Sequence, residues 1–185
     1  MLTLPLRVTD HLRRVIRLSV IASLASSAPS VWADCWERAG TTYSIDPLLL
    51  VAIAKVESNM RSDAINVNRN GTQDIGLMQV NSMHLPAFRE KGISKQKLLE
   101  PCPSVMAGAE ILSGFIKRHG YGWEAVGAYN AGSAPERAGL RRSYIRKIWG
   151  QYARLIAERR SRLPYRQAVA TSRTYRGGAA GDLGR

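Results

Sequence analysis

Hydrophobic residues along this chain recur at the spacing of helices rather than of strands. The clearest segment is 48–57, which is almost entirely apolar and follows Asp46 and Pro47. Asp at an N-cap and Pro at the first helical position are a strong start signal, so a helix is predicted from Pro47 to Glu57. Apolar spacing and glycine stops predict further helices over 35–40, 94–99, 103–120 and 123–129, and a last one from about residue 142.

The stretch that follows the helix ending at Glu57 has a different character. Residues 60–74 are polar and rich in turn-forming residues, including Asn70 and Gly71, which indicates a loop or a small hairpin. No segment sustains the alternation of apolar and polar residues that is typical of a strand. The sequence therefore predicts a mainly α single domain with a polar, β-poor loop region after this helix.

The first 33 residues are typical of a secretory signal peptide. Four arginines precede an apolar run from Leu18, and small residues follow it up to Ala33. The run is about half as long as the roughly 20 residues that a membrane span needs. The alternative is an uncleaved amphipathic helix on the membrane. We expect an exported, periplasmic protein that begins near Asp34 and meets the membrane only through its signal peptide before cleavage.

The positive charge is concentrated at the two ends of the chain. The 185 residues include 27 Lys and Arg against 14 Asp and Glu, a net charge of +13. Residues 34–153 hold 15 basic and 11 acidic side chains, so the central block is only mildly basic. Residues 158–185 form an arginine-rich tail that we expect to be disordered, with docking onto the cell wall or a partner protein as the alternative. No nucleic-acid partner is expected.

Two cysteines rule out a disulfide-dense miniprotein and a Cys-rich zinc module. In an oxidising compartment, Cys35 and Cys102 are most simply explained as one disulfide. A catalytic thiol is the alternative, but neither cysteine lies near a histidine in the sequence. The three histidines are too scattered to indicate a metal site, and we expect neither a metal nor a cofactor.

Glu57 is the most informative single residue. It lies four residues after Ile53 and seven after Leu50, and so shares the apolar face of its helix. Partial burial and the negative end of the helix dipole would both raise its pKa, as a general acid requires. The alternative is that Glu57 marks the end of the helix and points into water.

Three further segments bear on this choice. They are Gly-Leu-Met-Gln at 76–79, Ala-Tyr-Asn-Ala-Gly at 128–132, and Tyr144 near the start of the last predicted helix. Taken singly, each has a structural explanation as a turn, core packing or a helix stop. Their spacing alone does not decide between structure and function.

Together with Glu57-Ser58, these segments resemble the catalytic domain of soluble lytic transglycosylases in order and content. The resemblance covers about residues 34–157, nearly the whole chain after the signal peptide. The short single-domain form, with Cys35-Trp36 and a second cysteine at 102, looks most like the small specialised transglycosylases that accompany type III or type IV secretion machines. The basic tail is not part of the family pattern.

The resemblance implies a lysozyme-like (goose-type) helical fold and cleavage of the β-1,4 bond between N-acetylmuramic acid and N-acetylglucosamine in peptidoglycan. It implies Glu57 as the one catalytic carboxyl group, with Tyr129 orienting it and a 1,6-anhydro end as the product. It also implies a group of residues that bind the glycan or support the site, namely Ser58, Met78, Gln79, Asn130 and Tyr144.

Two alternatives remain from the sequence. The first is a hydrolysing muramidase, in which Asp63 or Asp74 activates water as a second carboxylate. The second is a non-catalytic protein of cell-wall assembly that keeps the groove and binds peptidoglycan. The expected partners are glycan strands and components of a secretion system.

Overall fold

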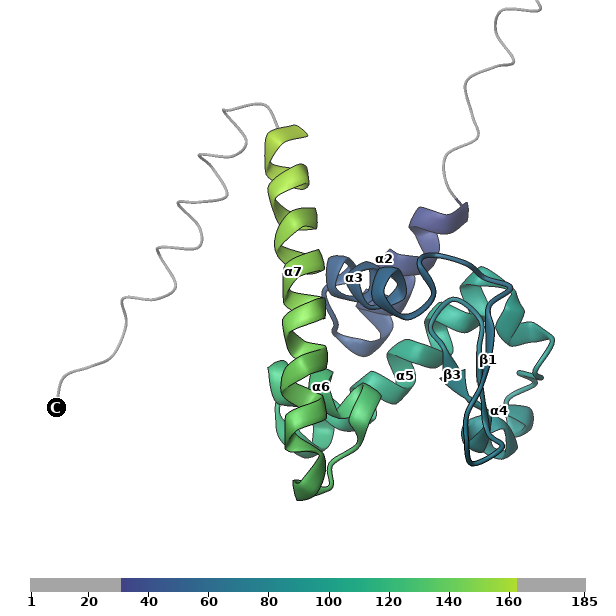
Figure 1. The fold of residues 1–185 in the computed structure, drawn as a ribbon. Coiled ribbons are helices and arrows are strands. Elements are labelled where there is room, and N and C mark those ends of the chain that lie inside the picture. The colour runs from purple at the N-terminus through teal and green to yellow at the C-terminus, as the bar shows by residue number, and fades with distance from the viewer. Residues whose placement is uncertain (1–30, 163–185) are drawn as a thin grey trace, which may run out of the picture.

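The computed structural model describes residues 31–162, and the side chains from residue 34 onward. It is built mainly from helices (Figure 1). These are α2 (Val31–Tyr43), α3 (Pro47–Ser58), α4 (Leu85–Glu90), α5 (Pro101–His119), α6 (Trp123–Ala131) and α7 (Ala138–Arg162), with short 3₁₀ helices at Ser82–His84, Lys97–Leu99 and Pro135–Arg137. The mainly α architecture is therefore as predicted. No helix within residues 31–162 is both long and apolar enough to cross a membrane.

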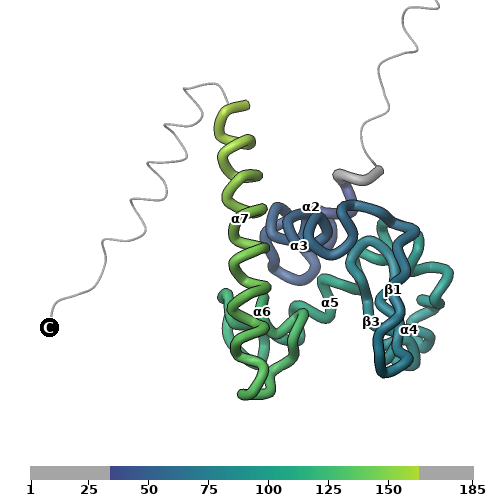
Figure 2. The backbone as a smooth tube through the Cα atoms, in the orientation of Figure 1, coloured from purple at the N-terminus to yellow at the C-terminus, as the bar shows by residue number. Residues whose placement is uncertain are grey.

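Helix α3 begins as the sequence predicts. The Asp46 side chain accepts a hydrogen bond from the Leu48 backbone N–H at 2.8 Å, and Pro47 occupies the first turn. Leu50 and Ile53 are fully buried. Helix α3 packs against α2 and α7, while α5 packs against α2 and α6 (Figure 2).

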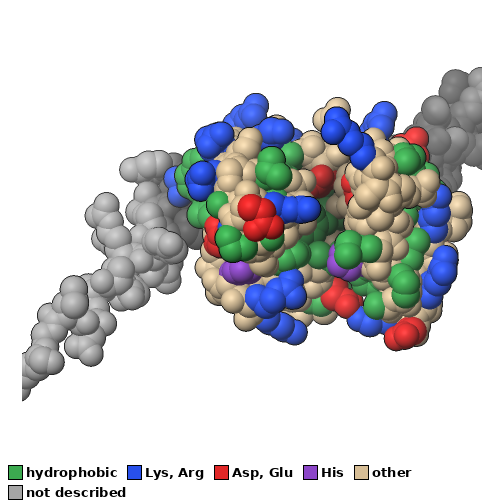
Figure 3. Space-filling view, turned by 60° about the horizontal axis from the view of Figure 1, so that its bottom comes forward, with side chains coloured by type: hydrophobic (Ala, Val, Ile, Leu, Met, Phe, Trp, Pro, Cys, Tyr) green, Lys and Arg blue, Asp and Glu red, His purple; other side chains and the backbone are tan. Residues whose placement is uncertain are grey.

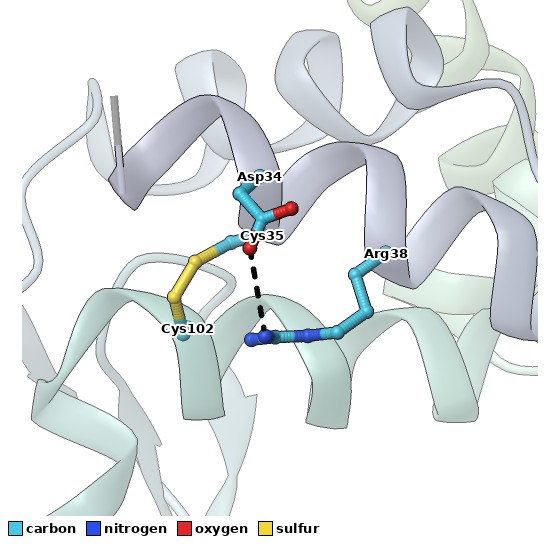
Figure 4. The surroundings of a disulfide bond; sticks show 4 residues. All are labelled: Asp34, Cys35, Arg38 and Cys102. Carbon is cyan, nitrogen blue, oxygen red and sulfur yellow. Dashed lines mark ion pairs between the residues drawn. A yellow bond between two sulfur atoms is a disulfide. The ribbon is translucent and has the colours of Figure 1, made fainter. Parts of the chain in front are cut away.

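A disulfide joins Cys35 in α2 to Cys102 at the start of α5, which confirms the predicted pairing (Figure 4). The bond closes a sequence separation of 67 residues, and Cys35 is almost completely buried. It therefore ties the beginning of the domain to the long helix that runs through its middle.

The polar region after α3 folds into three short antiparallel strands in the order β1-β2-β3. They are β1 (Ile65–Val67), β2 (Gln73–Ile75) and β3 (Val80–Asn81). Ile65 pairs with Ile75, and Asp74 pairs with Asn81. In Figure 1 these strands and α4 lie on the opposite side of α5 from α6 and α7. The three strands and α4 thus form one half of the molecule, and α6 and α7 belong to the other half.

Several predicted helix boundaries were wrong, for physical reasons that the structure supplies. Gly40 does not end α2; a Cβ there would lie 2.7 Å from the Ile45 carbonyl oxygen, so this glycine serves close packing inside the helix. Helix α5 starts at Pro101 rather than Pro103, because a first turn tolerates both prolines. Helix α6 continues to Ala131, and the short helix predicted over 94–99 is only the 3₁₀ turn Lys97–Leu99.

Helix α7 starts four residues earlier than predicted, at Ala138, and continues to Arg162. It thus runs past residue 157, where the sequence placed the end of the domain. The predicted signal peptide and the rest of the basic tail lie outside the described residues, apart from residues 31–33, which open α2.

Candidate active site

Glu57 occupies the last turn of α3, on the side that faces the strands and α7. The Tyr144 hydroxyl donates a hydrogen bond to Glu57 Oε1 at 2.5 Å. The pKa of Glu57 is raised to about 7, chiefly because burial disfavours the charged carboxylate. The Tyr144 hydrogen bond and the charge of Lys147 act in the opposite direction, while the charge of Asp74 raises the pKa further. A carboxyl group that is partly protonated near neutral pH can act as an acid and then as a base.

The end of α3 is anchored to the sheet region directly after Glu57. The buried Ser58 hydroxyl donates to the Leu77 carbonyl oxygen at 2.8 Å. Asn59 adopts a left-handed conformation and its backbone N–H reaches the Ala54 carbonyl, which closes the helix. These contacts fix the direction in which Glu57 leaves the helix.

The Gly-Leu-Met-Gln segment forms the turn between β2 and β3. Gly76 has φ +75, and a Cβ at this position would lie 1.9 Å from the Leu98 carbonyl oxygen, so only glycine fits. Leu77 and Met78 are completely buried. The Gln79 amide donates to the Gly76 carbonyl at 2.8 Å. The segment is thus a rigid support beneath the site.

Tyr129 and Tyr144 have different partners from those that the resemblance implied. Tyr129 donates its hydroxyl proton to the Met78 carbonyl oxygen at 2.8 Å, and Tyr144 is the tyrosine that contacts the Glu57 carboxyl group. Burial raises the pKa of both tyrosines well above the usual value. Both hydroxyls are therefore protonated donors at neutral pH. Tyr144 orients Glu57 directly, and Tyr129 joins α6 to the turn that carries Met78.

A second carboxylate faces the same space from strand β2. Asp74 accepts hydrogen bonds from the side-chain amides of Asn81 at 2.7 Å and Asn68 at 3.0 Å. Each of the two carboxylate oxygens accepts one of these hydrogen bonds, so the carboxylate is held in a fixed orientation. This amide support could not be predicted, because asparagines in the turn-rich segment 66–74 have local explanations and Asn81 lies in a separate stretch.

These groups line a cavity of about 680 Å³, which Figure 3 shows as a hollow between the two halves of the molecule. Amide, hydroxyl and carboxylate side chains from the sheet region line one part of it, and apolar and polar residues of α5 and α6 line another. A smaller cavity of about 230 Å³ opens beside it, and Glu57 and Asn130 line both. An open groove lined by both polar and apolar side chains suits an extended sugar ligand, which has hydroxyl groups and apolar ring faces.

The structure brings most of the predicted site residues to these cavities, but not all of them. Glu57, Gln79, Tyr129 and Asn130 line the large cavity, and Tyr144 lines the small one. Ser58 and Met78 line neither; both are buried and act as structural contacts. Asp63 is exposed and away from the cavities, whereas Asp74 is in the wall. Sequence reasoning missed several lining residues, including His84, Phe115 and Arg137.

Residues 31–162 contain no cluster of three or more His, Cys, Asp or Glu side chains that could hold a metal ion. The cavities hold the Glu57 and Asp74 carboxyls and the two tyrosine hydroxyls, and their walls also include the basic side chains of His84, Arg137 and Lys147. The site can therefore donate and accept a proton at one carboxyl group and stabilise positive charge with the other.

Comparison with known proteins shows which proteins this chain and its fold resemble. Invasion protein IagB of Salmonella typhimurium is 50% identical over 130 residues, which cover 70% of this chain and 81% of that protein. Protein IpgF of Shigella flexneri is 46% identical over 127 residues, covering 68% of this chain and 84% of that protein. The fold matches a crystal structure of an inactive mutant of the lytic transglycosylase Slt from Pseudomonas aeruginosa with a TM-score of 0.56 and 23% identity. That match covers 78% of this chain and 27% of the Slt chain.

The family model for the transglycosylase SLT domain matches residues 34–151, which include every motif named above. The predicted lysozyme-like fold is confirmed by the match to Slt. This chain therefore belongs to the transglycosylase SLT domain family of enzymes that act on peptidoglycan.

Proposed function

We propose that this lytic transglycosylase uses Glu57 as its single acid and base to cleave the β-1,4 bond after N-acetylmuramic acid and to form a 1,6-anhydro end. The observation that carries the proposal is the position of Glu57. Glu57 lines both cavities, and its carboxyl group accepts a hydrogen bond from the Tyr144 hydroxyl. The pKa of this carboxyl group is about 7. A glycan strand that passes Glu57 would place a glycosidic oxygen beside the carboxyl group.

In the first step, protonated Glu57 gives its proton to the glycosidic oxygen, and the bond from that oxygen to C1 of muramic acid breaks. The acetamido oxygen of the same sugar stabilises the positive charge that develops at C1, as the family resemblance implies. Asp74 lines the large cavity together with Glu57, and its fixed carboxylate adds electrostatic stabilisation. The N-acetylglucosamine side leaves with a free hydroxyl group.

In the second step, the 6-hydroxyl oxygen of muramic acid attacks C1 and its proton passes to the Glu57 carboxylate. The new bond closes the anhydro ring, and Glu57 regains the proton that it gave up. The Tyr144 hydroxyl stabilises the intermediate carboxylate through its hydrogen bond to Oε1. No water is consumed, so the reaction is a lyase rather than a hydrolase reaction.

The alternatives involve the same residues. A hydrolysing muramidase would use Asp74 to activate water; each Asp74 oxygen accepts one amide hydrogen bond and keeps a second lone pair, so the reaction products separate hydrolysis from the lyase reaction. Asp63 is exposed outside the cavities. A purely binding protein has no need of a carboxyl group whose pKa is raised to about 7 by burial.

The products of the reaction test the mechanism directly. Purified protein incubated with peptidoglycan should release muropeptides that end in 1,6-anhydromuramic acid, seen by mass spectrometry as loss of one water relative to the reducing form. Reducing ends in their place would contradict the mechanism and favour hydrolysis. Denatured protein in the same buffer is the control for spontaneous release.

The pH dependence offers a second test, because two neighbours shift the pKa of Glu57 in opposite directions. Activity should fall as pH rises through about 7, when the acid loses its proton. Asp74→Asn removes a negative charge that raises this pKa, so the alkaline limb of the pH profile should move to lower pH. Tyr144→Phe removes a hydrogen bond that favours the carboxylate, so the limb should move to higher pH. Limbs that do not move would contradict the assignment of Glu57 as the titrating group.

The cellular role is the second part of the proposal. We infer that the protein acts in the periplasm and opens the cell wall locally for a secretion apparatus. The support is the signal-like N-terminal sequence, the disulfide, and the similarity to a protein named for invasion. Deletion of the gene should lower secretion through that apparatus, and the wild-type gene, but not one carrying Glu57→Gln, should restore it.

A further inference from the structure

We propose that the small cavity beside Glu57 binds the anionic peptide stem of the muramic acid at the cleaved bond, with Lys147 as the cation that recognises a stem carboxylate. This inference rests on the proposed function and adds a substrate requirement to it. The cavity measures about 230 Å³ and is lined by Val56, Glu57, Asn130, Leu140, Ser143, Tyr144 and Lys147.

The position of the small cavity restricts what can occupy it. Glu57 and Asn130 line both cavities, so the two spaces meet at the catalytic carboxyl group. A ligand in the small cavity is therefore attached within about one sugar of the scissile bond. The stem of the reacting muramic acid, which branches from its lactyl group, meets this condition.

Within residues 31–162, Lys147 is the one basic side chain in the lining of the small cavity, where it lies with the aliphatic side chains of Val56 and Leu140. The large cavity has a cation of its own, Arg137, among amide, hydroxyl and apolar side chains. Of these two basic residues, only Lys147 lines the same small space as the Glu57 carboxyl group and the Tyr144 hydroxyl. A peptide stem offers methyl groups, amides and carboxylates, whereas a leaving N-acetylglucosamine carries no charge for a lysine.

Lys147 and Leu140 are both available to a ligand. Lys147 is exposed and forms none of the ion pairs found within residues 31–162. Leu140 is 61% exposed, so its side chain is accessible to a ligand. Ser143 and Asn130 also line the small cavity and can form hydrogen bonds with the amides of a peptide backbone.

The test compares two kinds of soluble, uncrosslinked glycan strand. One carries natural stems, and the other carries stems whose carboxylates have been converted to methylamides, so that length is kept and charge is lost. The quantity measured is the ratio of kcat/KM on charged strands to kcat/KM on neutralised strands. Any effect of a variant on the acidity of Glu57 acts on both substrates and cancels in this ratio.

For Lys147→Met, we expect the ratio to fall about fivefold, the scale of one partly exposed ion pair. Lys147→Glu should lower the ratio further, because it adds repulsion. Arg146→Met is the matched control: it removes the same charge from the neighbouring, exposed position of α7, outside both cavities, and should leave the ratio unchanged. All of these positions are exposed, so the variants should fold.

Two outcomes would overturn the inference. An unchanged ratio in Lys147→Met, whether or not both rates fall together, would show that Lys147 does not recognise the charge of the stem. A fall with Arg137→Met and none with Lys147→Met would place the stem in the large cavity, which Arg137 lines.

A binding measurement separates this inference from the proposed function. The Glu57→Gln variant, with and without Lys147→Met, is titrated with both kinds of strand. Preferential loss of affinity for charged strands supports the inference even if the wild-type protein yields hydrolytic rather than anhydro products. No difference between the strands would contradict it, whatever the wild-type protein cleaves.

Discussion

Replacing Glu57 by Gln should lower the rate of peptidoglycan cleavage by about 10²- to 10⁴-fold, the usual contribution of a general acid and base. The substitution keeps the shape of the side chain, and an amide oxygen can still accept the hydrogen bond from Tyr144. What it removes is the proton that the leaving oxygen needs and the carboxylate that accepts a proton in the second step. Release of anhydro-muropeptides under conditions of excess substrate measures the loss.

The fold of this variant should survive, which makes the result interpretable. Glu57 is largely desolvated and lies near the negative charge of Asp74, so its charged form is not a source of stability. The unfolding temperature of Glu57→Gln should therefore equal or exceed that of the wild type. Glu90→Gln is the control for removing one carboxylate, because Glu90 is exposed at the end of α4. Near wild-type cleavage by Glu57→Gln would contradict the one-carboxylate mechanism.

Much of α3 and its chemistry could be predicted from the sequence, because the signals are local. Asp46 and Pro47 mark the start of the helix, and the spacing of Leu50, Ile53 and Glu57 places the carboxyl group on the buried face. Burial then raises the pKa, as expected for a carboxyl group on an apolar surface. Helical periodicity contains this information without any knowledge of tertiary packing.

Which of the two tyrosines contacts the Glu57 carboxyl group could not be predicted in the same way. Whether Tyr129 or Tyr144 reaches Glu57 depends on how α6 and α7 cross α3, and the chain separations are 72 and 87 residues. Likewise, Asn68 and Asn81 support Asp74 only because β2 pairs with its neighbours in one register. Strands of two or three residues are too short to show a pattern in sequence.

The glycine of the Gly-Leu-Met-Gln turn should be the most sensitive position for stability. In Gly76→Ala, left-handed backbone strain and overpacking should together lower the free energy of unfolding by about 2–5 kcal/mol. The added Cβ would lie 1.9 Å from the Leu98 carbonyl oxygen and 2.9 Å from Ser104 Oγ, and neither backbone nor buried helix can yield easily. Urea unfolding with the disulfide kept oxidised measures the change.

Gly71→Ala separates the two causes, since Gly71 also has a positive φ, +80, but a Cβ there would meet no atom within 4 Å. Only the backbone strain should remain, at about 1–2 kcal/mol. If both variants lose the same amount, the close approach between Gly76 and Leu98 contributes nothing. A larger loss in Gly76→Ala would mean that this contact holds the turn in place, and with it the Met78 carbonyl that Tyr129 bonds and the Leu77 carbonyl that anchors Ser58 beside Glu57. In that case the glycine of the motif acts on catalysis through the position of the turn, and cleavage by Gly76→Ala should fall further than its folded fraction.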